Sequence, residues 1–205
     1  DSYAGSNFKK NAEGNGKTFY GAGIQAGAVL SKKNNQHSIF GSRDQSNGYR
    51  FNTQFENLKL LYQGNVQIDS ANEIMTSFGY TKNEFGANGF YAAPGDRNST
   101  EAVQTTLASV QSKHKLSEKW MLMPRLSYRY NFDDYRYFGD TNPNAGISKH
   151  STHSLAAEVN STYKTKGGEL GLGAELRSDA INSSNIGKHQ RENVGIYAQY
   201  RTFLT

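Results

Sequence analysis

The stretch 120–138 alternates between apolar and polar side chains with a period of two residues, which predicts a β-strand. One face carries Trp120, Leu122, Pro124, Leu126, Tyr128, Tyr130 and Phe132, and the other carries Met121, Met123, Arg125, Ser127, Arg129, Asn131 and Asp133. From Trp120 to Tyr130 the chain advances ten residues, which is roughly 33 Å along a strand and roughly 23 Å along the normal of a bilayer at a tilt near 45°. This matches the apolar band of about 25 Å on an outer-membrane β-barrel, between its two rows of aromatic side chains.

The same alternation predicts about ten strands along the chain. They cover residues 2–9, 18–31, 36–42, 58–68, 73–81, 101–116, 120–138, 155–163, 170–176 and 193–201, the first of them being the weakest pattern. Within 101–116, Val103 and Leu107 share a parity that Val110 breaks, so we expect a bulge or a mixed face there.

The connections between these strands come in two lengths that alternate. Those at 32–35, 69–72, 117–119 and 166–168 are short, and those at 43–55, 82–100, 139–150 and 179–190 have about a dozen residues or more. Outer-membrane barrels combine short periplasmic turns with long extracellular loops. The pattern therefore predicts an antiparallel transmembrane β-barrel of the all-β class, located in the bacterial outer membrane.

Composition and charge exclude several other classes of protein and of functional site. The 205 residues are 35% hydrophobic and contain no run of 18 apolar residues, which excludes a transmembrane helix. The absence of cysteine excludes disulfides, thiolate metal sites and cysteine nucleophiles. The net charge of +5 is spread along the chain without a basic block, so we expect no nucleic-acid partner.

Several phrases of the sequence resemble consecutive barrel strands of TonB-dependent outer-membrane receptors, especially those of Bacteroidota. They are SNGYRFNTQFEN at 46–57, LLYQGNVQ at 60–67, FGANGFYAAPGD at 85–96, EAVQTTLASVQ at 101–111, YRYNFDDYRYF at 128–138 and HQRENVGIYAQYRT at 189–202. The resemblance implies a wall of the 22-stranded type filled by a plug. It also implies uptake of a nutrient such as a siderophore or cobalamin, with energy passed on by TonB.

The chain departs from that family in having only about ten strands and nothing that resembles a plug or a TonB-contacting segment. The resemblance therefore implies that residues 1–205 are a barrel segment. The remaining barrel and the plug, which contacts TonB, would lie in the same receptor or in a second chain. Lipid and lipopolysaccharide would surround the wall. A self-contained small pore and an outer-membrane hydrolase are the alternatives.

No residues converge on a catalytic, cofactor or metal site in the sequence. His150 and His153 are three residues apart, and Asp133 and Asp134 are adjacent, so in a strand each pair points to opposite faces. Ser154 beside His153 lacks an orienting acid and an oxyanion element. We therefore expect no enzymatic activity.

The candidate ligand contacts are aromatic side chains of the long connections and arginines of the polar face. Aromatic rings offer stacking surfaces, and the arginines have the parity of the lumen, where a salt-bridged wall against a plug or water is the alternative to a ligand site. These candidates are Tyr49, Phe51, Phe90, Tyr91, Tyr135, Tyr137, Arg125, Arg129 and Arg177.

Overall fold

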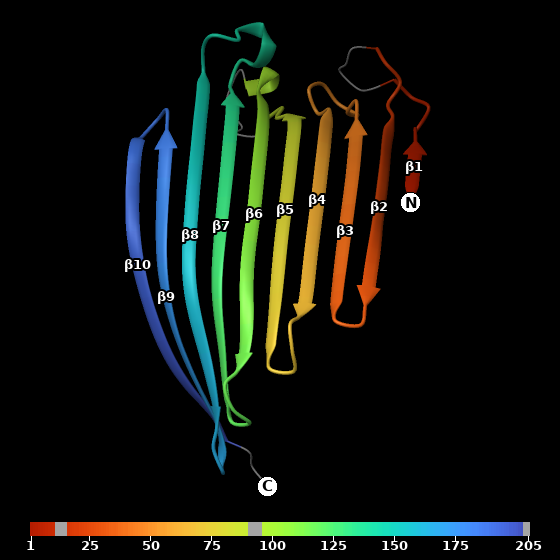
Figure 1. The fold of residues 1–205 in the computed structure, drawn as a ribbon. Coiled ribbons are helices and arrows are strands. Elements are labelled where there is room, and N and C mark those ends of the chain that lie inside the picture. Colours follow the sequence, from red (N-terminus) through yellow and green to blue (C-terminus); the bar gives the residue numbers. More distant parts are fainter. Residues whose placement is uncertain (11–15, 90–95, 203–205) are drawn as a thin grey trace.

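Ten strands follow one another in the order of the sequence and form one antiparallel sheet (Figure 1). This computed structural model describes residues 1–10, 16–89 and 96–202. The strands are β1 (Ser2–Gly5), β2 (Gly21–Lys32), β3 (Asn35–Ser46), β4 (Phe55–Gln67), β5 (Asn72–Gly86), β6 (Thr100–Lys115), β7 (Trp120–Arg136), β8 (Ile147–Lys164), β9 (Gly168–Ser183) and β10 (Gly187–Thr202). Two short 3₁₀ helices, η1 (Asp96–Asn98) and η2 (Gly139–Thr141), lie in the connections. No helix among these residues has the length and apolar character needed to cross a bilayer.

The sheet is open. β1 pairs only with β2, and β10 pairs only with β9 along its whole length of 16 residues. Within the described part of the chain, no ladder joins β1 to β10. The outer edge of β10 therefore presents a full row of backbone donors and acceptors that have no partner strand in this sheet.

The registers place each predicted face on one side of the sheet. Directly opposed residues form rows across the sheet, as in the row Leu60, Tyr80, Thr106 and Tyr130 on β4 to β7. We call the two sides the apolar face and the polar face. The apolar face exposes the large side chains of Ile24, Leu30, Ile39, Leu60, Phe78, Val110, Leu126, Leu155, Val159, Leu172, Leu176, Val194 and Ile196. An exposed apolar surface that crosses nine strands requires an apolar environment.

Aromatic side chains bound this apolar surface at both ends. Trp120 and Tyr163 are directly opposed near the short turns, and Trp120 Nε1 donates a hydrogen bond of 2.8 Å to Ser161. Nearer the longer connections lie Tyr80 on β5 and Tyr130 on β7, which register places in one row through Thr106, and Tyr128 two residues before Tyr130. The two rows match the interfacial aromatics that the sequence predicted.

The prediction of a long connection at 179–190 is wrong. β9 continues to Ser183 and β10 begins at Gly187, so only residues 184–186 connect them, and Asp179 pairs with Arg191 inside the ladder. Beyond the apolar band both faces of a strand are polar, so the alternation fades while the backbone hydrogen bonds continue. For the same reason β3 and β5 extend past the predicted ends at Ser42 and Thr81.

The remaining connections keep the predicted contrast. The long connections between β3 and β8 are 47–54, 87–99 and 137–146, all at one end of the sheet, and the short turns are 33–34, 68–71, 116–119 and 165–167 at the other (Figure 1). The connection between β1 and β2, residues 6–20, is also long. No bulge occurs near Val110, because the register between β6 and β7 is the same on both sides of it. Val110 instead lies on the apolar face and Leu107 on the polar face. The ladder is interrupted only opposite Pro124, which has no amide hydrogen to donate.

Candidate functional site

The three long connections pack against one another at one end of the sheet. Asn52 Nδ2 donates hydrogen bonds to the carbonyl oxygens of Arg97, at 2.8 Å, and of Ser99, at 2.6 Å. Asn88 Nδ2 donates to the carbonyl oxygen of Phe51 at 2.7 Å. Ser99 is fully buried, and its hydroxyl donates to carbonyl oxygens within the same connection. Connections 47–54 and 87–99 are therefore fixed to each other by side-chain to backbone hydrogen bonds.

The aromatic candidates occupy different environments in this region. Tyr49 is 47% exposed and meets the ring of Phe19 edge-on, at 6.0 Å between centroids. The Phe51 ring lies under the guanidinium of Arg97, which is 5.3 Å from its centroid. Of these rings, Tyr49 has the most surface available to a ligand.

The other aromatic candidates divide into buried, packed and undescribed residues. Tyr135 lies on the polar face of β7 and is only 9% exposed. Tyr137 packs edge-on against Phe138, at 5.0 Å between centroids. Phe90 and Tyr91 lie outside the described residues. The described aromatic candidates therefore do not form one continuous surface.

Three arginines lie close together on the polar face of β7, β9 and β10. Register places Arg129, Ser154, Asp179 and Arg191 directly opposite one another on four consecutive strands, β7 to β10. Asp179 Oδ1 accepts hydrogen bonds from Ser154 Oγ at 2.6 Å and from Arg177 Nε at 3.0 Å, and Oδ2 accepts one from Arg191 Nε at 3.0 Å. We call these five residues the arginine cluster. It adjoins a cavity of about 400 Å³.

The candidate Arg125 stands apart from this cluster. Its Nη1 lies 4.0 Å from Glu158 Oε2, on the neighbouring strand of the same polar face. Arg129 and Arg177, by contrast, both line the cavity. The structure therefore brings together two of the three predicted arginines and adds Arg191, which sequence reasoning missed as a candidate. Asp179 was placed in a connection by the sequence, so its pairing with Arg191 was not visible.

A second group of polar side chains lies on the polar face of β6, β7 and β8, nearer the long connections than the arginine cluster. Glu101 and Asp133 each have a buried carboxylate oxygen without a hydrogen-bond partner among the described residues. His150 is directly opposite Asp133, but its Nδ1 is hydrogen-bonded to Ser183 Oγ at 2.8 Å. Among the residues that the structure describes, no group of three or more acidic or histidine side chains is arranged to hold a metal ion.

The residues considered for hydrolysis do not converge. Asp133 and Asp134 lie on opposite faces of β7, and so do His150 and His153 on β8. His153 Nδ1 is hydrogen-bonded to Tyr128 on the apolar face at 2.7 Å, whereas Ser154 points to Asp179 on the polar face. Ser154 and His153 therefore do not form a nucleophile and base pair.

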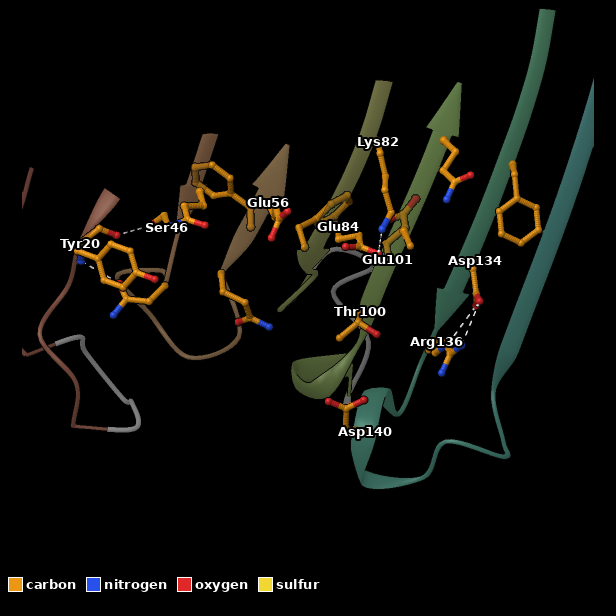
Figure 2. Close-up of a pocket in the computed structure, with 18 of the residues that line it drawn as sticks. Tyr20, Ser46, Glu56, Lys82, Glu84, Thr100, Glu101, Asp134, Arg136 and Asp140 are labelled. Carbon is orange, nitrogen blue, oxygen red and sulfur yellow. Dashed lines mark hydrogen bonds and ion pairs between the residues drawn. The ribbon is translucent and has the colours of Figure 1, made fainter. Parts of the chain in front are cut away.

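A larger cavity, about 880 Å³, lies along the ends of β2 to β7 beside the long connections (Figure 2). Most of its lining belongs to the apolar face above the aromatic row, where the side chains become charged. Lys82 Nζ lies 2.7 Å from Glu84 Oε1, and Arg136 Nη2 lies 3.1 Å from Asp134 Oδ2 (Figure 2). Lys149 Nζ lies 3.5 Å from the same oxygen of Asp134. The apolar face thus ends in a band of charged pairs. The sequence signal that could have found this band is the recurrence of charged residues at the positions of each strand that continue its apolar face.

The sequence matches no protein-family model and no curated protein. The fold, however, is similar to parts of solved transporter structures. The copper transporter OprC aligns over 100% of this chain and 34% of its own, with a TM-score of 0.67 and 10% identity. The ferric-catecholate import receptor Fiu from E. coli aligns over 89% of this chain and 31% of its own, with a TM-score of 0.65 and 11% identity. The siderophore receptor PirA from Pseudomonas aeruginosa aligns over 96% and 32%, with a TM-score of 0.60 and 13% identity.

The chain spans about a third of the length of these structures. At such low identity the likeness concerns the fold alone. The ten strands therefore form an open antiparallel sheet with the architecture of part of a TonB-dependent receptor barrel, and the similar structures are transporters rather than enzymes.

Proposed function

We propose that the chain is part of the wall of an outer-membrane TonB-dependent transporter that takes up a nutrient such as a siderophore or cobalamin. The observation that carries this proposal is the two-faced sheet, which aligns along its whole length with a third of a transporter. Its apolar face suits lipid, and its polar face suits the lumen of a barrel. The longer connections would then form the extracellular side.

The proposal requires partner strands at both edges of the sheet. Unpaired backbone groups inside the hydrocarbon region cost several kcal/mol each, so both the outer edge of β10 and that of β1 must be covered. The remaining barrel strands and the plug, in the same receptor or in a second chain, would supply these contacts. TonB would act through that plug. A pore made only of these ten strands would need β1 to pair with β10.

Lipid and lipopolysaccharide are the partners proposed for the apolar face. Acyl chains would contact the surface between the aromatic rows. The charged band above it, with Arg43 paired to Glu56 at 2.8 Å and Lys82 paired to Glu84, would lie at the level of the head groups.

The proposed function is tested by uptake measurements in a strain that lacks the protein. Loss of accumulation of a radiolabelled iron chelate or of cobalamin, restored by the wild-type gene only when TonB is present, would support it. Accumulation that remains independent of TonB would favour a passive pore and contradict the proposal.

The aromatic ligand contacts are tested in the same assay. Tyr49→Ala is expected to weaken ligand capture without changing assembly, because its ring is largely exposed. Ile68→Ala serves as the matched control, since Ile68 is exposed at the opposite end of the sheet. Equal uptake by the two variants would remove Tyr49 from the ligand site. Tyr135→Ala is instead expected to impair assembly, because that side chain is buried.

A further inference from the structure

We propose that the arginine cluster is a binding site for a small oxyanion, a molecule bearing carboxylate or phosphate groups. This inference rests on the proposed function and deepens it, because it gives the ligand of the transporter an anionic character.

The charges of the cluster do not balance. Three guanidinium groups, those of Arg129, Arg177 and Arg191, line the same cavity as the single carboxylate of Asp179, which binds only Arg177 and Arg191 among them. Among the described residues, Arg129 has no acidic side chain within 4.0 Å, and its only hydrogen bond is to Asn131, at 3.4 Å. The cluster therefore carries a surplus of two positive charges on one face, which an anion can neutralise.

Asp179 orients the guanidinium groups of Arg177 and Arg191 but accepts a hydrogen bond from only one nitrogen of each. Arg177 and Arg191 both bind it through Nε, and their Nη groups have no hydrogen-bond partner in the part of the chain that the structure describes. The Asp179 side chain is 18% exposed, whereas those of Arg177 and Arg191 are 44% and 71% exposed. The carboxylate thus lies beneath two forks whose remaining donors face outward. An arginine held in this way loses less rotamer freedom when it binds an anion.

The neighbouring cavity has the size of a small-molecule site. Its volume of about 400 Å³ falls in the range usual for ligand pockets. Thr152 and Ile181 also line it, so a polar group and an apolar wall accompany the arginines. A planar oxyanion can accept two parallel hydrogen bonds from each guanidinium fork.

The position of the cluster makes it accessible from the side of the long connections. Arg129 lies between Tyr128 and Tyr130 in sequence, so it is level with the upper aromatic row but on the other face. The connection between β9 and β10 has only three residues, 184–186, and no long loop from these two strands covers the cluster. A ligand that enters the lumen from the extracellular side would meet the cluster near the mouth.

The experiment measures anion binding to the purified outer-membrane assembly that contains this chain. Citrate and inorganic phosphate are titrated at low ionic strength by calorimetry, with sucrose as the uncharged control. Arg129→Gln and Arg191→Gln are each expected to weaken binding of the preferred anion about tenfold, since each removes charge-assisted hydrogen bonds. Arg43→Gln, on the apolar face, is the matched control and is expected to bind as the wild type does.

A second measurement needs no variant. Phenylglyoxal modifies exposed arginines, and mass spectrometry reports the extent at each site. Citrate or phosphate is expected to protect Arg129 and Arg191 while leaving Arg43 reactive.

Arginine-dependent binding of either anion supports the site, and the tighter of the two gives the class of oxyanion. Unchanged affinity in both variants, or equal protection of all three arginines, would overturn the inference. If TonB-dependent uptake persisted in that case, the proposed function would stand and only the anion site would fall.

Discussion

Replacing Leu126 by arginine tests the assignment of the apolar face at the depth where an arginine in contact with lipid is expected to cost the most free energy. Ten residues separate Trp120 from Tyr130, the two aromatic limits on β7, so the midplane lies near residue 125. Each residue advances roughly 2.3 Å along the bilayer normal at a tilt near 45°. Leu126 therefore lies within about 3 Å of the midplane. An arginine there is expected to cost about 2–4 kcal/mol, a factor of roughly 30 to 800 in the ratio of folded to unfolded protein.

Ser127→Arg is the matched control for that change. Ser127 has almost the same depth but lies on the polar face, where its direct neighbours Ser109 and Ala156 leave room for a long side chain. Its cost is expected to stay below about 1 kcal/mol, the size usual for exposed substitutions. Urea unfolding of the reconstituted assembly, read from the mobility of unheated samples on SDS gels, measures both variants. Equal destabilisation by Leu126→Arg and Ser127→Arg, or a larger effect of the second, would refute the assignment of the faces.

Three further predictions concern the connections. Hydrogen bonds from the Asn72 side chain and from the backbone amides of Ala71 and Asn72 lower the pKa of Asp69, so the turn 68–71 should keep this stabilisation at pH values above the ordinary carboxyl pKa and lose it as the pH falls through the lowered one. Amide hydrogen exchange, corrected for the intrinsic pH dependence of the exchange rate, should show this loss of protection, and protection that does not change with pH would contradict it. Asn52→Ala removes the side-chain donor to the carbonyl oxygens of Arg97 and Ser99, the second of which keeps a hydrogen bond from the Ala87 amide, and should cost about 1–3 kcal/mol, measured by urea unfolding of the reconstituted assembly. Faster limited proteolysis in connection 87–99 is also expected, and unchanged values would count against the packed loops. Gly139→Ala should displace η2, because Gly139 has φ of +53° and an added Cβ would overlap the carbonyl oxygen of Asn98; hydrogen exchange equal to that of the wild type would exclude this.

Hydrophobic alternation was sufficient to predict the part of the fold between the aromatic rows. Between Trp120 and Tyr130 every second side chain is apolar or aromatic, so the sequence carries a strong period of two, and the predicted strand is confirmed. Nearer the long connections both faces are polar and this alternation disappears. The ladder from Asp179 to Ser183 therefore escaped prediction, although its backbone hydrogen bonds are as regular as those below.

The site was less predictable than the fold, because its geometry depends on register. Arg129 and Arg177 could be assigned to the polar face by parity. Their proximity to Arg191 depends on pairing across β7 to β10, and no local pattern encodes which residues of four strands stand opposite one another. The burial of Tyr135 was likewise invisible, since an aromatic residue near a strand end reads equally well as exposed or packed.

Because every strand is hydrogen-bonded only to its neighbours in the sequence, the sheet behaves as a linear array of hairpins rather than as a three-dimensional core. In such an array stability is approximately a sum of local contributions from each unit and its two interfaces. A hairpin can then be added or removed during evolution by joining the flanking strands, without repacking distant residues. The circumference of such a wall is thus free to change by steps of two strands, while its height remains set by the length of the strands.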